Sequence, residues 1–376
     1  MKKIFILTGE PSGDKLAAQV VKNLNKDNID LQFLCLGGEH LKRLGINSIK
    51  ELNDVTYLGF TKVFLNIFKI KKNIKETANQ IIKFNPDILF SVDSPDFTLR
   101  VAEIVKKMAP KIKTIHFVAP QVWVWREGRV KKIKKFIDHI LLLFKFEKQY
   151  FEKENVSCKF VGHPLLEKSN EAKIDIGQII GKNKAIISIF PGSRISEMEV
   201  LMPILINFIK LMNFKYQDFL YVFHTTQDLR NNLENILKKS NIDNYDIVSD
   251  EKIKGYIIER SIFAITKSGT ISLEVSYKKI PSIVIYKINL INFLLVKFLV
   301  KVKYVNIINI AADKMIIPEL LQSNCNPDSI FQMVSSFMEN TKKMSDQTEE
   351  TQKVLKEFTT KTSPSENVAN FLKAHI

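Results

Sequence analysis

A short apolar stretch near the middle of the chain runs directly into a turn whose residue types favour anion binding. Residues 186–190 predict a buried strand, and Gly192, Ser193 and Arg194 follow it before a helical pattern begins. Unpaired N–H groups and the positive end of a helix dipole converge at such a turn. Gly192 would let a ligand approach the backbone, and the Arg194 guanidinium can fork onto two phosphate oxygens. An ordinary turn with a solvated arginine is the alternative interpretation.

A second turn of this kind follows later in the chain. Residues 262–266 predict another strand, and the small residues Ser268, Gly269 and Thr270 come after it. Their backbone and hydroxyl groups are donors for a diphosphate, and Glu274, about one helical turn further on, can accept hydrogen bonds from a ribose diol. The same residues are also a common start of a helix.

The loop after the first apolar run is acidic. Glu10, Ser12 and Asp14 lie between or beside Gly9 and Gly13. The glycine spacing does not match the G-x-G-x-x-G fingerprint of dinucleotide sites, and two carboxylates would repel a pyrophosphate. We therefore expect this loop to face a sugar or a hydroxyl acceptor.

Two more carboxylates, Asp93 and Asp96, follow the apolar residues 88–92. A carboxylate at a strand end, held by a turn that a proline stiffens, is well placed to act as a general base. Asp93, directly at the strand end, is the better candidate. The alternative is an Asx-turn that caps the next helix.

Both tryptophans of the chain lie in residues 119–129, and a lysine-rich stretch follows them. Trp123 and Arg126 fit a surface that stacks on a ligand and contacts phosphate, and nucleic-acid binding would use the same residue types. A buried tryptophan beside a solvated helix face is equally compatible with the pattern.

The composition limits the classes of protein. The chain has 376 residues, 45% of them apolar, which favours two globular domains, and its formal net charge of +16 favours an anionic partner such as a nucleic acid, a phosphorylated substrate or a membrane surface. The three cysteines show no metal-ligand spacing, so we expect a reducing compartment and neither a metal site nor a cofactor.

Short apolar runs alternate with helical patterns along the whole chain, which predicts two doubly wound parallel sheets in series. We expect domains at residues 1–164 and 165–376, with the loops named above around one cleft and a C-terminal helical segment that crosses back or meets a partner chain. The expected strands lie near 3–8, 31–36, 87–92, 113–118, 139–143, 158–161, 185–190, 219–224, 246–248, 262–266 and 282–286.

Residues 60–75 and 287–304 mix apolar and basic side chains at helical spacing. Such segments lie comfortably in a membrane interface or against acyl chains. A core helix with outward lysines is the alternative for either one.

Seven blocks, in order along nearly the whole chain, resemble the lipid-A-disaccharide synthases, which are inverting glycosyltransferases with the two-Rossmann GT-B fold. The blocks are residues 9–14, 93–97, 120–126, 160–164, 191–194, 268–274 and 318–322.

The resemblance implies an activity: UDP-2,3-diacylglucosamine is joined to 2,3-diacylglucosamine 1-phosphate by a β(1→6) bond and UDP is released, without a metal or cofactor. It implies a cytoplasmic enzyme at the inner face of the inner membrane and allows a homodimer. Within the same fold, a UDP-sugar epimerase or another UDP-sugar transferase is the nearest alternative.

The resemblance also implies roles for single residues. Asp93 would be the base and Arg194 would stabilise the departing diphosphate. The other donor-side residues would be Gly192, Ser193, Ser268, Gly269, Thr270, Glu274 and Asn309, and the acceptor-side residues Glu10, Ser12, Asp14, Asp96, Trp123 and Arg126. Ile308 stands where the family usually has proline, so the geometry beside Asn309 is open.

Overall fold

The computed structural model describes residues 1–27, 29–56, 66–124, 128–167, 184–288 and 303–376. The chain divides into two compact units: one comprises residues 1–167 together with 358–376, and the other comprises residues 168–357. Parts of the predicted amphipathic segments 60–75 and 287–304 lie outside the described residues.

The first unit contains a six-stranded parallel sheet in the order β2-β1-β3-β4-β5-β6. Each strand that we expected in this half of the sequence is present. The strands are β1 (Lys2–Thr8), β2 (Leu31–Leu36), β3 (Ile88–Val92), β4 (Lys113–Phe117), β5 (His139–Leu142) and β6 (Cys158–Phe160). The helices are α1 (Pro11–Leu24), α2 (Glu39–Lys42), α4 (Ile67–Phe84), α5 (Pro95–Met108), α6 (Arg129–Ile133), α7 (Lys148–Glu152) and α16 (Pro364–Lys373).

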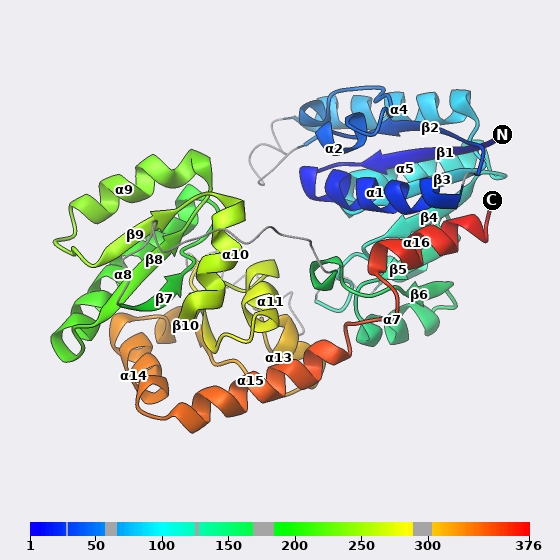
Figure 1. Ribbon diagram of the computed structural model, residues 1–376. Coiled ribbons are helices and arrows are strands. Elements are labelled where there is room, and N and C mark those ends of the chain that lie inside the picture. Colours follow the sequence, from blue (N-terminus) through cyan, green and yellow to red (C-terminus); the bar gives the residue numbers. More distant parts are fainter. Residues whose placement is uncertain (28, 57–65, 125–127, 168–183, 289–302) are drawn as a thin grey trace. The chain divides into compact units, whose positions relative to one another are not determined.

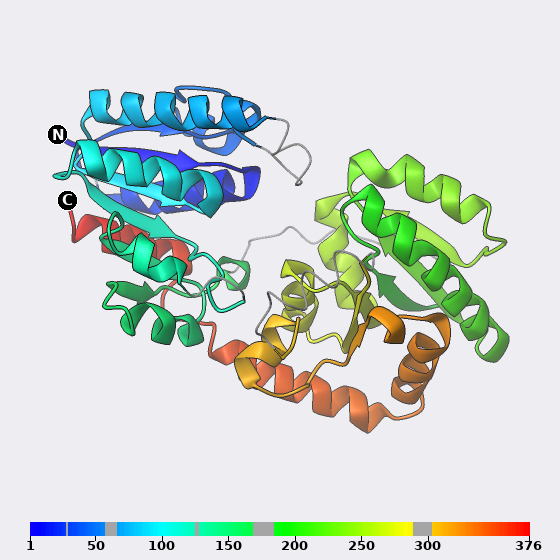
Figure 2. The ribbon, with the colours of Figure 1, turned by 180° about the vertical axis from the view of Figure 1, so that it is seen from behind.

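Side-chain alternation along β1 shows how this sheet is covered on both faces. Phe5 and Leu7 pack in one cluster with residues of α4 and α5, whereas Ile4 and Ile6 pack in another with residues of α1 and α16. Figure 1 shows α1 and α16 over one face, and Figure 2, from behind, shows α4 and α5 over the other. Because both faces are buried, the strands read as continuous apolar runs.

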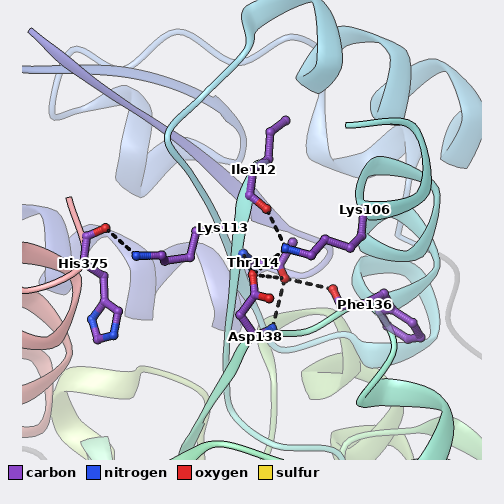
Figure 3. Close-up of polar contacts among 7 residues, drawn as sticks. All are labelled: Lys106, Ile112, Lys113, Thr114, Phe136, Asp138 and His375. Atoms are coloured by element: carbon purple, nitrogen blue, oxygen red, sulfur yellow. Dashed lines mark hydrogen bonds and ion pairs between the residues drawn. The ribbon is translucent and has the colours of Figure 1, made fainter. Parts of the chain in front are cut away.

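A polar network ties the amino ends of β4 and β5 to the helices beside them (Figure 3). Oδ2 of Asp138 accepts hydrogen bonds from Nζ of Lys106 at 2.7 Å and from the backbone N–H of Thr114 at 2.8 Å. Burial opposes ionisation of Asp138, but these hydrogen bonds outweigh it and lower the pKa of the carboxyl. Next to it, Nζ of Lys113 donates to the carbonyl of His375 at 3.1 Å. These contacts fix the edge of the sheet opposite the predicted functional loops.

The second unit contains another six-stranded parallel sheet, in the order β12-β11-β10-β7-β8-β9. The sequence pattern predicts every one of these strands except β12. The strands are β7 (Ala185–Ile189), β8 (Phe219–His224), β9 (Tyr245–Val248), β10 (Ser261–Thr266), β11 (Ser282–Tyr286) and β12 (Glu319–Leu321). The helices are α8 (Ile195–Lys215), α9 (Arg230–Lys238), α10 (Glu251–Arg260), α11 (Thr270–Tyr277), α13 (Ile307–Ala312), α14 (Pro327–Met338) and α15 (Thr341–Lys356).

Helices cover this sheet on both faces as well. Ile187 and Ile189 of β7 pack with residues of α8, α9 and α14, whereas Ile186 packs with residues of α10. Because the strands are parallel, the turns after β7 and β10 leave the sheet at the same edge, where ligands of doubly wound folds bind. Among the residues that the structure describes, no helix combines the length and the apolar character needed to cross a bilayer.

Candidate active site

The loop between β3 and α5 holds Asp93 and Ser94 in a strained backbone conformation. Their φ angles of 54° and 45° are left-handed, which is uncommon for residues other than glycine. Val118, just after the neighbouring strand β4, has a φ of 71°, an outlier for a β-branched residue. Strain of this kind clusters at functional sites, so the carboxyl ends of β3 and β4 are the candidate catalytic region of this unit.

The carboxylate of Asp93 is partly exposed and is oriented by its neighbours. Its Oδ1 accepts a hydrogen bond from the backbone N–H of Ser94 at 2.8 Å, and its Oδ2 accepts one from the hydroxyl of Ser12 at 3.4 Å. The hydroxyl of Thr98 donates to the Asp93 carbonyl at 2.7 Å and so fixes the loop. A fixed carboxylate with one weakly engaged oxygen can take a proton from a substrate hydroxyl.

The loop of residues 9–14 lies against the Asp93 loop because its two glycines lack side chains. A Cβ on Gly9 would lie 2.6 Å from the Cβ of Ser94, and a Cβ on Gly13 would lie 3.0 Å from the carbonyl oxygen of Val92. This close packing brings Ser12 to Asp93.

The two acidic residues of this loop have different surroundings. Glu10 is the N-cap residue of α1 and is partly exposed. Asp14 is 1% exposed, and its carboxylate accepts hydrogen bonds from the backbone N–H groups of Gly38 at 2.7 Å and His40 at 2.8 Å. Asp14 therefore anchors the start of α2 to α1, and it can act on an acceptor only through that packing.

Asp96 lies at the start of α5 and is exposed to solvent. Its Oδ1 forms an ion pair with Nη2 of Arg129 at 3.1 Å, and the same nitrogen donates to the carbonyl of Pro95 at 3.0 Å. Asp96 thus links α5 to α6.

Trp123 belongs to the core of the first unit. It is 7% exposed, its Nε1 donates to Oε1 of Glu147 at 3.4 Å, and its ring meets Phe146 edge to face. Glu147 is itself buried, and burial raises its pKa to about 7. The predicted partner of this tryptophan, Arg126, lies outside the described residues.

In the second unit, Glu197 closes the turn that follows β7. Gly192 has a φ of +119°, and a Cβ there would lie 2.5 Å from Oε2 and 2.8 Å from Cβ of Glu197. That same Oε2 accepts the backbone N–H of Ser193 at 3.1 Å. Arg194, the N-cap residue of α8, is 69% exposed and its Nη1 lies 3.7 Å from Oε1 of Glu197. The missing side chain of Gly192 therefore makes room for Glu197, while Arg194 faces solvent.

A hydrogen bond to a distant segment of the chain holds the turn after β10. The hydroxyl of Ser268 donates to the carbonyl of Val305 at 2.5 Å, and Gly269 has a φ of +140° directly before Thr270, the exposed first residue of α11. Glu274 is held one turn into α11, where its Oε2 lies 3.3 Å from Nζ of Lys254. The start of α11 therefore combines the exposed residues Gly269 and Thr270 with the Glu274 carboxylate, which Lys254 holds in place.

Asn309 is fully buried, and its side chain is hydrogen bonded on all sides. Nδ2 donates to the carbonyl of Ile317 at 2.7 Å and to Oε1 of Glu319 at 2.8 Å, while Oδ1 accepts the backbone N–H groups of Ile316 and Ile317 at 2.9 Å each. The Glu319 carboxylate also accepts the backbone N–H of Val305. Asn309 thus holds the chain that supports Ser268.

Glu197 and Glu319 organise the second unit, yet neither stands out in the sequence as a functional residue. A signal existed for Glu197, because glutamate at the third position of a helix commonly reaches back to the residues before it. Glu319 left no such signal, since its partners lie 10 to 14 residues away in the sequence.

Comparison with known proteins finds relatives along nearly the whole chain. Residues 4–371 match the family model described as lipid-A-disaccharide synthetase. The lipid-A-disaccharide synthases of Rickettsia typhi and Rickettsia prowazekii are each 35% identical to this chain, with 99% of both chains covered.

Solved structures share the fold. The S. aureus MnaA–UDP co-structure matches with a TM-score of 0.66 at 14% identity, covering 100% of this chain and 97% of that one. Acinetobacter baumannii MurG matches with a TM-score of 0.59 at 12% identity and full coverage of both chains. A UDP-GlcNAc 2-epimerase from Neisseria meningitidis matches with a TM-score of 0.62 at 13% identity, covering 100% of this chain and 99% of the epimerase.

These structural likenesses and the two parallel sheets confirm the predicted GT-B architecture. At such low identity they show the fold alone, so they do not favour an epimerase. The family model and the curated relatives decide between a transferase and an epimerase. The chain belongs to the lipid-A-disaccharide synthase family and is a glycosyltransferase of lipid A biosynthesis.

Proposed function

We propose that the chain transfers the sugar of UDP-2,3-diacylglucosamine to the 6-hydroxyl of 2,3-diacylglucosamine 1-phosphate, forming a β(1→6) bond and releasing UDP. The proposal rests on membership of the family, and the observation that carries its chemistry is the oriented Asp93 carboxylate on its strained loop.

Asp93 is the general base in this proposal. Its carboxylate takes the proton of the acceptor hydroxyl as that oxygen bonds to the anomeric carbon, and the bond from this carbon to the diphosphate breaks with inversion of configuration. The hydrogen bonds from Ser94 and Ser12 hold the carboxylate in position for the proton transfer.

The second unit supplies the donor site. Arg194 and the N–H groups at the start of α8 take up the negative charge that develops on the leaving diphosphate, together with Ser268, Gly269 and Thr270. Glu274, held by Lys254, accepts hydrogen bonds from the ribose. The chain's own cations and N–H groups perform this stabilisation, so the proposal calls for no metal ion.

The acceptor contacts the first unit. Glu10, Ser12 and Asp96 border the Asp93 loop and can bind sugar hydroxyls. Asp14 and Trp123 act from the interior by holding this side of the unit in shape. Arg126 completes the set as a phosphate contact.

The same unit also carries a surface suited to lipid. At the start of α4, Phe68 is 83% exposed beside the exposed Ile67, and the neighbouring Lys69, Lys71 and Lys72 are exposed as well. An apolar tip among lysines fits the headgroup region of an anionic membrane. We place the enzyme in the cytoplasm at the inner face of the inner membrane, and a homodimer is compatible with this assignment.

The test is an assay of purified protein in detergent micelles with EDTA present, with both acylated substrates and with UDP and the tetra-acyl disaccharide as readouts. We expect product with the wild type and loss of product with Asp93→Ala. If no disaccharide forms over a range of acyl lengths while UDP still binds, the lipid substrates are wrong and a different UDP-sugar reaction takes their place. Binding to RNA or DNA that falls steeply with salt and ignores UDP would contradict the transferase.

A further inference from the structure

The two turns of the donor site are connected by one ion pair. Nζ of Lys267, the residue directly after β10, lies 2.7 Å from Oε1 of Glu197, on the first turn of α8. The other carboxylate oxygen of Glu197 accepts the N–H of Ser193 in the turn after β7. One carboxylate therefore joins a backbone donor of the first turn to a cation of the second.

Lys267 is confined on more than one side. Its side chain is 16% exposed and that of Glu197 is 19% exposed, so the pair is largely shielded from water. Nζ of Lys267 also lies 5.5 Å from the ring centre of Tyr286, the last residue of β11. Burial and the nearby charge of Glu197 raise the pKa of Tyr286, while Arg194 opposes this rise. Tyr286, Glu197 and Arg194 therefore share one electrostatic environment with Lys267.

The register of the sheet makes this connection rigid. β10 pairs with β7 so that Ile265 lies opposite Ile189, and the backbone N–H of Phe190 donates to the carbonyl of Ile265 at 2.9 Å. The two turns therefore emerge from adjacent strands, one or two residues past a paired position. The contact of Glu197 with Gly192 holds the carboxylate from the other side.

A shielded ion pair needs an explanation, because removing both charges from water costs free energy that the attraction often fails to recover. A binding role supplies one. An ammonium group has three donors, and Glu197 uses the direction of one of them. The other two N–H donors of Lys267 are then within reach of an anion that the backbone N–H groups of these two turns bind.

We propose that Lys267 is a further diphosphate-binding residue of the donor site and that Glu197 is the positioning residue that aims its ammonium group. The inference rests on the function proposed above, since the UDP-sugar is the substrate that brings a diphosphate to these turns. Arg194 and Lys267 then contact the diphosphate from different strand ends, Arg194 from the exposed side and Lys267 from the shielded side.

The experiment measures UDP and uridine binding to the purified full chain by calorimetry. Lys267→Met should weaken UDP binding by roughly 10- to 100-fold, the range expected for one charge-assisted contact. Uridine, which carries no phosphate, should bind Lys267→Met and wild type equally. Lys267→Arg should retain most of the UDP affinity, because it keeps the charge.

The matched control is Lys278→Met, which removes a lysine of the same unit whose own side chain is buried to a similar degree and which also pairs with a glutamate. Lys278 is 15% exposed and its Nζ lies 2.6 Å from Oε1 of Glu259. UDP affinity should not change in this variant. If Lys267→Met does not fold, Lys267→Gln carries the same expectation, since it also lacks the charge.

Glu197→Gln tests the positioning role. The glutamine amide oxygen can still accept the Ser193 N–H, so this change acts on UDP only through the Lys267 ammonium group. It should weaken UDP binding less than Lys267→Met does, and the double variant should bind UDP no more weakly than Lys267→Met alone. Tighter UDP binding by Glu197→Gln would overturn the inference, since it would show that the carboxylate competes with the diphosphate. Unchanged UDP binding by Lys267→Met would also overturn it and leave the proposed function intact. A wild type that binds no UDP would overturn both.

Discussion

The hydroxyl of Ser12 lies 3.4 Å from Oδ2 of Asp93, so a loop that follows the first strand of the sequence reaches the carboxylate that follows the third. The long distance indicates a weak contact, and the shorter bond from the Ser94 N–H at 2.8 Å dominates the orientation of the carboxylate.

We expect Asp93→Asn to lower kcat by about 10²- to 10⁴-fold, the usual contribution of a general base. UDP affinity should not change, because the proposed UDP contacts belong to the other unit. The check is a steady-state assay combined with UDP calorimetry. Glu103→Gln, on an exposed position of α5, is the control and should behave as wild type. If Asp93→Asn weakened UDP binding by as large a factor as it lowers kcat, Asp93 would not be acting as a general base.

Gly9→Ala should destabilise the first unit and lower activity. The new Cβ would lie 2.6 Å from the Cβ of Ser94, so the Asp93 loop must shift, at a cost of about 1–3 kcal/mol in the free energy of unfolding. Urea unfolding measures the first effect and the transfer assay the second. Gly128→Ala is the matched control, because its Cβ would meet nothing within 4 Å among the described residues.

Asn309→Ala should lower the free energy of unfolding by about 2–5 kcal/mol, because it leaves the buried N–H and carbonyl groups of Ile317 without their partner. Urea unfolding of the two proteins checks this. Asn309→Asp should not rescue stability, since a carboxylate would face Glu319. Unchanged stability with loss of UDP binding would instead indicate that Asn309 contacts the ligand directly.

Stability should fall as the pH drops below about 6.5. Burial lowers the pKa of His116 and His224 to about 3 and of His163 to about 4, so these histidines stay neutral in the folded protein while the unfolded chain takes up protons. The pKa of Glu147 is raised to about 7, so the folded protein binds this proton before the unfolded chain does. Glu147 therefore adds stability as the pH falls from about 7 to 4.5 and partly offsets the histidines. The net effect of the four groups is a loss of roughly 1 kcal/mol per pH unit near pH 6.5, which grows to about 2.5 kcal/mol per pH unit near pH 5.5.

Urea unfolding at pH 7.5, 6.5 and 5.5 measures this slope. Glu147→Gln should make it steeper, because it removes the one opposing group of the four. A flat profile between pH 6.5 and 5.5 would show that the buried histidines take up protons without unfolding.

The strands could be predicted because a strand that is buried on both faces has a continuous run of apolar residues. Ile4 to Leu7 are all fully buried, and the apolar run shows it directly. β12 escaped prediction because it is a three-residue edge strand that begins with Glu319. Its place in the sheet depends on pairing with β11, which no local pattern reveals.

In the candidate site, too, some features could be predicted from the sequence and others could not. Residue types at strand ends pointed to Asp93 and Arg194, and both lie at the carboxyl edge of their sheets. The surroundings of single side chains could not be predicted: Asp14 and Trp123 read as ligand contacts, yet both are buried by contacts with residues more than 20 positions away. Which side of a loop faces solvent is decided by such distant packing.

The helix α16 has a consequence for how the protein is made. Its buried residues Val368, Ala369 and Leu372 complete the cluster that covers Ile4 and Ile6, yet the whole second unit lies between them in the sequence. At about 5–20 residues per second, a ribosome needs roughly 10–40 s to make that intervening stretch. During this time one face of the first sheet has α1 but lacks α16, the second of its two covering helices. The unit that begins to emerge first is therefore the last to be finished, and the nascent chain must keep that apolar face from aggregating until residues 364–373 have emerged.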